Sequence, residues 1–180
     1  MPLVAIQLLW LNIVTDGIQD FALSFEKAEK NIMKEKQKDS SASIIDKSLL
    51  TQTLVSGLVI GILVFIVWYY LINGLKLEVS IARGYIMLLM VFMQNIHVFN
   101  CRSERESAFK VSIKSNPFIV ISVICCIILQ VIVMEVSVLA KLLQTSPVPL
   151  VHVLMLFLVA SIVLIVLELY KEFVYHKKEK

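Results

Sequence analysis

The sequence predicts an all-α membrane protein, a bundle of five transmembrane helices. Of its 180 residues, 58% are hydrophobic and only 17% are charged, and the mean hydropathy of +0.84 is far above that of a soluble domain. The charged residues are crowded into blocks such as Glu26–Lys47, whereas Leu49–Asn73 has none. Apolar runs recur at about the 20-residue length that a helix needs to cross the hydrocarbon core. An ordinary soluble enzyme, a disordered chain and a nucleic-acid-binding protein are therefore excluded.

The first apolar run, Leu3–Leu23, is predicted to be a transmembrane helix and not a signal peptide. It has no basic segment before it and no small-residue cleavage site, and it carries polar residues in its interior. Gly17 directly follows Asp16, and a glycine there loosens a helix and can free backbone carbonyls. We therefore expect the first helix to be partly unwound.

Four further spans follow, and together the five make residues 1–180 one membrane domain without an internal repeat. Pro117 and Pro149 stand at span starts, where the missing backbone N–H is not needed. Gly57 and Gly61 form a GxxxG pattern, which can be a close-packing face or a chance occurrence. The spans after the first are Leu50–Ile72, Ile81–Asn100, Pro117–Ala140 and Leu150–Tyr170.

The distribution of Lys and Arg predicts the orientation of the bundle. Fourteen of the 17 basic residues fall in three segments on one side, Ser24–Ser48, Cys101–Asn116 and Lys171–Lys180. Basic loops stay in the cytoplasm, so the amino terminus is expected outside or in a lumen and the carboxy terminus in the cytoplasm. An odd number of spans that starts from outside suggests that the amino-terminal part of a larger protein is missing. Ser24–Lys38 alternates Glu and Lys, which suits either a helical extension or a solvated connector.

A stripe of polar residues runs along one face of the first span. Its members are spaced at i, i+3, i+4, i+7 and i+8, and ionisable groups inside a span mark an ion or substrate path by default. Amide, hydroxyl and carboxylate oxygens are the ligands that a hard cation such as Ca²⁺ prefers. For the last two members, an alternative is that they lie near the membrane edge and meet water. The stripe consists of Asn12, Thr15, Asp16, Gln19 and Asp20.

Other polar residues in the spans admit two interpretations. Gln94 can line the ion site or make an interhelical hydrogen bond, with Asn95 off to the side of its face. Glu168 and Lys171 lie near the cytoplasmic end of the last span, where a surface ion pair at i, i+3 accounts for both.

The segment Leu9-Trp10-Leu11-Asn12-Ile13-Val14-Thr15-Asp16-Gly17 resembles the sixth transmembrane helix of P-type calcium-transporting ATPases, in which a motif L-W-x-N-x-x-T-D-G carries ion ligands. The resemblance covers essentially the whole chain as helices six to ten of that family. Supporting matches are Ala22–Glu26, Ile32-Met33, Asn100–Ser103, Ser107, Phe109 and Asn116. The sequence departs from the family at Gln19, where proline is usual, and at Ser24 and Lys27, where Gly and Pro are common.

The resemblance implies a set of metal ligands and a transported ion. Asn12, Thr15 and Asp16 match the family residues that coordinate the ion, and Ca²⁺ is implied because the sodium and proton pumps have an acid at the position of Asn12. Gln94 stands where two-site calcium pumps have a glutamate and resembles pumps thought to carry one calcium. These four residues are the candidate site.

Two hypotheses about function are favoured over a third, a small independent secondary transporter, which the absence of a repeat relating two halves weakens. One is that the chain is the membrane module of an ATP-driven P-type calcium pump, a translocase, which adds Asn, Thr and Asp ligands to the ion site. The alternative is a non-catalytic accessory or scaffold protein derived from such a pump. The sequence has no D-K-T-G and no G-x-x-x-x-G-K, so Mg-ATP would act only through domains absent from this chain. The expected partners are the lipid bilayer and the amino-terminal transmembrane and cytoplasmic ATPase domains of the same pump, with no nucleic acid.

Overall fold

A computed structural model describes residues 1–27, 47–103 and 106–175, and over these residues the chain forms helices and no strand. The segment Ser24–Lys38, for which a helical extension or a solvated connector was considered, lies outside the described residues from position 28 onward, and residues 24–27 begin with a turn. The elements in order are α1 (Ala5–Leu11), η1 (Asn12–Gly17), α2 (Ile18–Leu23), α3 (Lys47–Tyr69), η3 (Tyr70–Gly74), α4 (Val79–Cys101), η4 (Ile113–Ser115), α5 (Pro117–Glu135), α6 (Ser137–Leu142) and α7 (Leu150–Tyr175).

The all-α membrane bundle is confirmed. Within the described residues, four helices are long and apolar enough to cross a membrane, namely Leu49–Gly74, Val79–Cys101, Pro117–Glu135 and Leu150–Val174. The first expected span is also helical from Ala5 to Leu23, but it is divided into α1, η1 and α2 because its middle is a π-helix.

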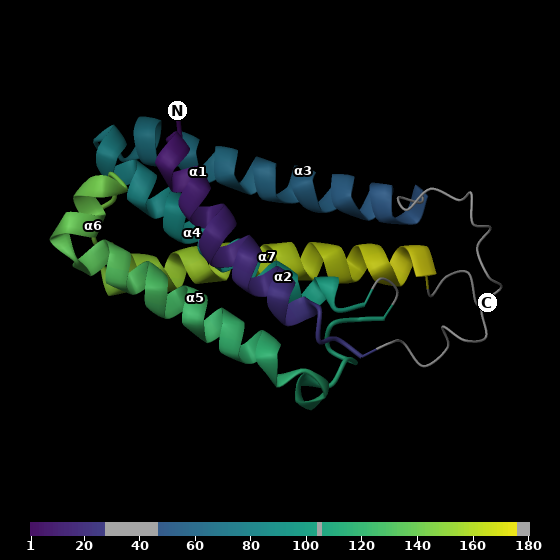
Figure 1. Ribbon diagram of the computed structural model, residues 1–180. Coiled ribbons are helices and arrows are strands. Elements are labelled where there is room, and N and C mark those ends of the chain that lie inside the picture. The colour runs from purple at the N-terminus through teal and green to yellow at the C-terminus, as the bar shows by residue number, and fades with distance from the viewer. Residues whose placement is uncertain (28–46, 104–105, 176–180) are drawn as a thin grey trace.

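The fourth span ends earlier than the sequence predicts. We expected Pro117–Ala140, but α5 stops at Glu135, because Val136 adopts an extended backbone with φ −80° and ψ 109°. The short helix α6 then starts at Ser137 and turns the chain toward α7 (Figure 1). Residues after the break are still mostly apolar, so hydropathy could not reveal where the helix ends.

Helix α4 lies at the centre of the bundle. It packs against α3, α5, α7 and the first helix, and Ala82, Ile86 and Leu89 on it are completely buried. Yet α4 is the least apolar of the four long helices. Helix α3 is largely exposed, as expected of a helix that faces lipid, because lipid and not water is the solvent for its side chains.

The glycines in the long helices differ in how closely a neighbouring segment approaches them. A Cβ on Gly57 or Gly61 would meet nothing within 4 Å, so the GxxxG pattern is no packing face among the described residues. A Cβ on Gly84, in α4, would lie only 3.1 Å from the backbone oxygen of Ser146. Gly84 therefore permits α4 to approach the connection between α6 and α7.

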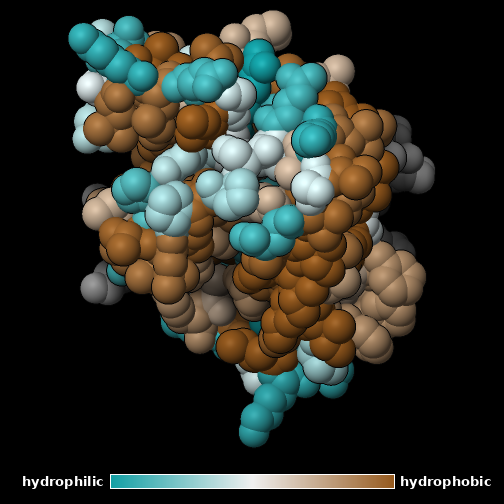
Figure 2. All heavy atoms as spheres, turned by 90° about the vertical axis from the view of Figure 1, so that its left-hand side faces the viewer, coloured by the Kyte–Doolittle hydropathy of each residue, from teal (hydrophilic) through white to brown (hydrophobic). Residues whose placement is uncertain are grey.

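Different segments of the chain meet at the two ends of the bundle. The amino terminus, the α3–α4 connection and α6 lie at one end, and α2, the loop after α4 and the end of α7 lie toward the other (Figure 1). In a view onto the first end, hydrophilic residues gather over the upper part of the face, and apolar residues cover most of the flanks (Figure 2).

A candidate cation site in the first helix

The first helix widens into a π-helix over Asn12–Gly17, the segment that carries most of the polar stripe. We expected a partly unwound helix at Gly17, and the structure shows this wider turn instead. Gly17 keeps right-handed helical angles, φ −60° and ψ −44°, and the helix stays continuous. Single π-helical turns are rare and are found frequently at functional sites.

Gln94, on α4, joins the two central residues of this turn. The Gln94 side-chain nitrogen Nε2 donates a hydrogen bond of 3.1 Å to the Asp16 carboxylate oxygen Oδ1. The Gln94 oxygen Oε1 lies 2.6 Å from the Thr15 hydroxyl, which is also 2.6 Å from the Leu11 carbonyl oxygen. A hydroxyl has one proton, so Thr15 donates to one of these two acceptors at a time.

The four predicted ligands are therefore placed unequally. Thr15 is fully buried, Asp16 and Gln94 are half-buried, and these three meet at the contact between η1 and α4. Asn12 is exposed on the outside of the bundle, and no hydrogen bond among the described residues joins it to the other three. The structure brings together Thr15, Asp16 and Gln94 and leaves Asn12 on the open side.

Gln19 and Asn95 form a second polar contact, one turn along the first helix, that we did not predict. Gln19 is 5% exposed, and its Nε2 donates a 2.6 Å hydrogen bond to Asn95 Oδ1. The alternative that Gln19 meets water is therefore wrong for this structure, while Asp20 is exposed. The sequence spacing hinted at this contact, since Asn95 directly follows Gln94 and Gln19 lies one helical turn after Thr15. The sequence did not show how α4 is rotated about its axis, and that rotation decides whether the two side chains meet.

The oxygen atoms at this contact suit a hard cation only in part. Ca²⁺ takes six to eight oxygen ligands. The turn offers the Asp16 carboxylate, the Thr15 hydroxyl and the Gln94 amide oxygen. No cluster of three or more His, Cys, Asp or Glu side chains suitable for a metal occurs in the described ranges. A complete site needs oxygens from beyond these three residues.

An ion-paired cluster ties the end of the first helix to the loop after α4. Arg102 is buried, and its guanidinium donates a 2.9 Å hydrogen bond to each carboxylate oxygen of Glu26. It also donates to the backbone oxygen of Ser112 and to Ser115 Oγ. Burial raises the pKa of Glu26, but the hydrogen bonds from Arg102 and Asn116 and the charge of Arg102 outweigh it and hold that pKa below its usual value. The cluster anchors the helix that carries the η1 turn.

Lys171 is a second anchor at this end, and here the expected surface ion pair is wrong. Lys171 is only 2% exposed, and its ammonium donates to the backbone oxygens of Asn100, Ser103 and Glu106 at 2.7, 2.6 and 3.2 Å. Glu168 accepts hydrogen bonds from the Asn100 side chain and the Ala108 N–H. Both residues therefore fasten the loop after α4 to α7, because buried backbone carbonyls need donors.

Residues 1–173 match the family model of the carboxy-terminal region of cation-transporting ATPases. A calcium-transporting ATPase of Bacillus subtilis is 30% identical over 133 residues, which cover 74% of this chain and 15% of the relative. Calcium-transporting ATPase 1 of Schizosaccharomyces pombe is 32% identical over 172 residues, which cover 94% of this chain and 19% of the relative. The human calcium-transporting ATPase type 2C member 1 is 31% identical over 175 residues, which cover 95% of this chain and 18% of the relative. The chain thus spans less than a fifth of the length of these relatives.

Proposed function

Because the chain belongs to the family of cation-transporting ATPases, as their carboxy-terminal membrane region, we propose that it is the membrane module of an ATP-driven calcium pump. In this proposal Ca²⁺ is the transported substrate, and Asn12, Thr15, Asp16 and Gln94 contribute oxygens to its site. Support for calcium comes from the relatives, which are calcium-transporting ATPases in each comparison above.

The observation that carries the proposal is the bridge from Gln94 to both Thr15 and Asp16 across two helices. In the bridged state the amide nitrogen satisfies the Asp16 carboxylate, which would otherwise lie unpaired in a membrane span. A divalent cation at Asp16 would compete with that N–H, and the Gln94 amide would turn its oxygen toward the ion. The same three side chains can therefore serve an empty and a loaded site.

The other ligands come, in this proposal, from the amino-terminal transmembrane helices of the same pump. The exposed position of Asn12 supports this, because it lies on a side of the first helix that no described helix covers. Asp16 contacts Gln94 on α4 but is only half-buried, so it is open to further ligands. The amino-terminal cytoplasmic domains would bind and hydrolyse Mg-ATP. The whole of 1–180 acts as one membrane domain with the amino terminus outside or lumenal and the carboxy terminus cytoplasmic.

The test replaces Asp16 in the product of the complete gene. Asp16→Asn should nearly abolish calcium-dependent phosphorylation from ATP, because a neutral amide cannot replace a carboxylate on a divalent cation. Thr15→Ala should have a milder effect, since a hydroxyl is a weaker ligand. Asp20→Asn makes the same change on an exposed residue of the same helix and should leave calcium affinity unchanged. Near-normal calcium affinity in Asp16→Asn would show that the site is elsewhere.

The accessory-protein alternative is tested separately. The genomic sequence immediately upstream should encode a D-K-T-G motif in the same reading frame, as a pump requires. A stop codon in that frame directly before Met1 would favour the accessory protein.

A further inference from the structure

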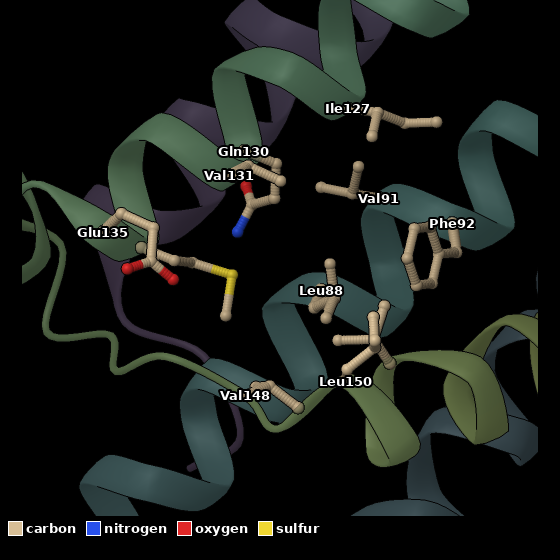
Figure 3. Close-up of a pocket in the computed structure, with 11 residues that line it drawn as sticks. Leu88, Val91, Phe92, Ile127, Gln130, Val131, Glu135, Val148 and Leu150 are labelled. Carbon is tan, nitrogen blue, oxygen red and sulfur yellow. The ribbon is translucent and has the colours of Figure 1, made fainter.

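A cavity of about 390 Å³ lies between α4, α5 and the start of α7, away from Thr15, Asp16 and Gln94 (Figure 3). All but two of its lining side chains are apolar, and Leu88, Val91 and Phe92 form its wall on α4. Val131 and Leu150 are 51% and 74% exposed, so the cavity opens on the flank of the bundle. Its volume lies within the range of ligand pockets, and apolar cavities of this kind take up apolar guests.

One of the two polar lining residues, Gln130, is a hydrogen-bond donor without an acceptor. Gln130 is 1% exposed, and its Oε1 accepts a 3.1 Å hydrogen bond from the Trp10 indole N–H. Its Nε2 has no partner in the described part of the chain, and the nitrogen points toward the space beside Leu88 and Val91 (Figure 3). A buried donor without an acceptor destabilises the protein by about 1–3 kcal/mol, so a ligand that brings an acceptor atom to this nitrogen gains binding free energy.

The other polar lining residue, Glu135, supplies a negative charge at the mouth. It is exposed and is the last residue of α5, five positions after Gln130. Five residues of helix rise about 7.5 Å. Both side chains line the same cavity, and this axial rise is comparable with the distance between the acyl ester and the amine of an aminophospholipid. Met134 lines the wall between the two, and its flexible thioether side chain can adjust to an occupant.

We propose that this cavity binds a membrane phospholipid with a primary-amine head group. One acyl chain of the lipid lies against the apolar walls, and the ester carbonyl of that chain accepts the hydrogen bond from Gln130 Nε2. The ammonium of the lipid head group pairs with Glu135. The helices that form the cavity are long and apolar enough to span a membrane, so their flank faces lipid. This inference goes beyond the calcium site and does not depend on it, because none of the four candidate ion ligands lines the cavity.

The test is photocrosslinking of the complete gene product in nanodiscs. The probes are phosphatidylethanolamine, phosphatidylcholine and phosphatidylglycerol, each with a diazirine on one acyl chain, and labelled peptides are identified by mass spectrometry. Labelling of the α4 and α5 cavity peptides should be strongest with phosphatidylethanolamine and weakest with the anionic phosphatidylglycerol. Gln130→Leu should lower it about five- to tenfold, the effect of one lost hydrogen bond to a buried donor.

Matched variants separate binding from folding. Trp10→Phe also breaks the Trp10–Gln130 hydrogen bond but keeps the amide donor, so its labelling should equal that of the wild type. Val131→Trp obstructs the mouth and should reduce labelling. Ile128→Trp adds the same side chain at an exposed α5 position that does not line the cavity, so it should leave labelling unchanged.

Glu135→Gln should remove the preference among head groups. Equal labelling by phosphatidylethanolamine and phosphatidylglycerol in the wild type, or unchanged labelling in both Gln130→Leu and Val131→Trp, overturns the proposal. None of these outcomes bears on calcium-dependent phosphorylation, so failure here is distinguishable from failure of the calcium site.

Discussion

Gln94 contacts Thr15 and Asp16 through the two ends of a single amide, so its side chain couples α4 to the π-helical turn. A neutral amide contributes one carbonyl oxygen to a cation, whereas a carboxylate at the same place adds charge and can bind through two oxygens. If Gln94 lines the proposed ion site, this difference predicts a site for one calcium and not for two.

Replacing Gln94 with alanine should weaken calcium binding by only a few-fold, about 1 kcal/mol, the scale of one lost hydrogen-bonding group. Isotope binding at saturating calcium should give one ion per phosphorylatable site in the wild type. Asn95→Ala, which removes the neighbouring contact with Gln19, should lower stability without changing calcium affinity. Two bound ions per site in the wild type would contradict the single-site prediction.

The Glu26–Arg102 pair should make stability depend on pH. The pKa of Glu26 in the folded protein lies below its usual 4.5, so the folded state favours the ionised carboxylate. Its contribution is therefore fully present above about pH 4.5 and is lost as the pH falls through the lower folded-state pKa. Glu26→Gln should reduce stability by about 1–3 kcal/mol at neutral pH, because Arg102 loses a partly buried counter-charge.

Thermal unfolding of the wild type and of Glu26→Gln, recorded in detergent across a pH series, checks this prediction. The gap between the two unfolding temperatures should be widest near neutral pH and should close in acid. A gap that stays constant down to pH 3 would mean that the carboxylate charge is not what holds Arg102.

Among the helices, α4 combines the most polar composition with the deepest burial, and its close approaches depend on a small residue. Gly84 lies against Ser146 and Thr145, where a Cβ would stand 3.1 Å from the nearest oxygens. Gly57, in α3, has open space around it. The two glycines therefore differ in packing although both are inside long apolar helices.

Gly84→Val should destabilise the protein by about 1–3 kcal/mol, because the added methyl groups force α4 away from the α6–α7 connection. Gly57→Ala should be neutral or should stabilise by up to about 1 kcal/mol, since alanine favours a helix over glycine and nothing opposes its methyl group. Chemical denaturation in mixed micelles measures both. A destabilising Gly57→Ala would indicate that another helix packs on that face of α3.

For the whole molecule, α6 and the loop after α4 lie toward opposite ends of the bundle (Figure 1). Lys141 belongs to α6 and Lys110 to that loop, and both side chains are exposed. The excess of basic residues in the loop that contains Lys110 predicts that this end is cytoplasmic. In a variant without native cysteines, Lys110→Cys should react with a membrane-impermeant maleimide applied to the cytoplasmic side of a sealed membrane. Lys141→Cys should react only when the reagent reaches the opposite side. The reverse pattern would invert the orientation.

The amino-acid sequence by itself determined the class of protein. Lipid accepts only segments whose backbone is bonded internally and whose side chains are apolar, and both requirements are local. The runs Leu50–Ile72 and Leu150–Tyr170 accordingly fall within the long apolar helices Leu49–Gly74 and Leu150–Val174. The sequence also predicted a polar stripe along one helix face, but in the structure Thr15 and Gln19 are buried while Asn12 and Asp20 are exposed. It could not locate the end of α5 at Glu135, where the residues that follow are as apolar as those before.

Only the tertiary structure decided which polar groups meet. The contacts of Gln94 with Asp16, of Gln19 with Asn95 and of Lys171 with the loop after α4 join residues 65 to 78 positions apart. Such pairs depend on how far each helix is rotated about its axis and where it crosses its neighbour. Those two quantities are set by side-chain packing over the whole bundle and not by any local run of residues.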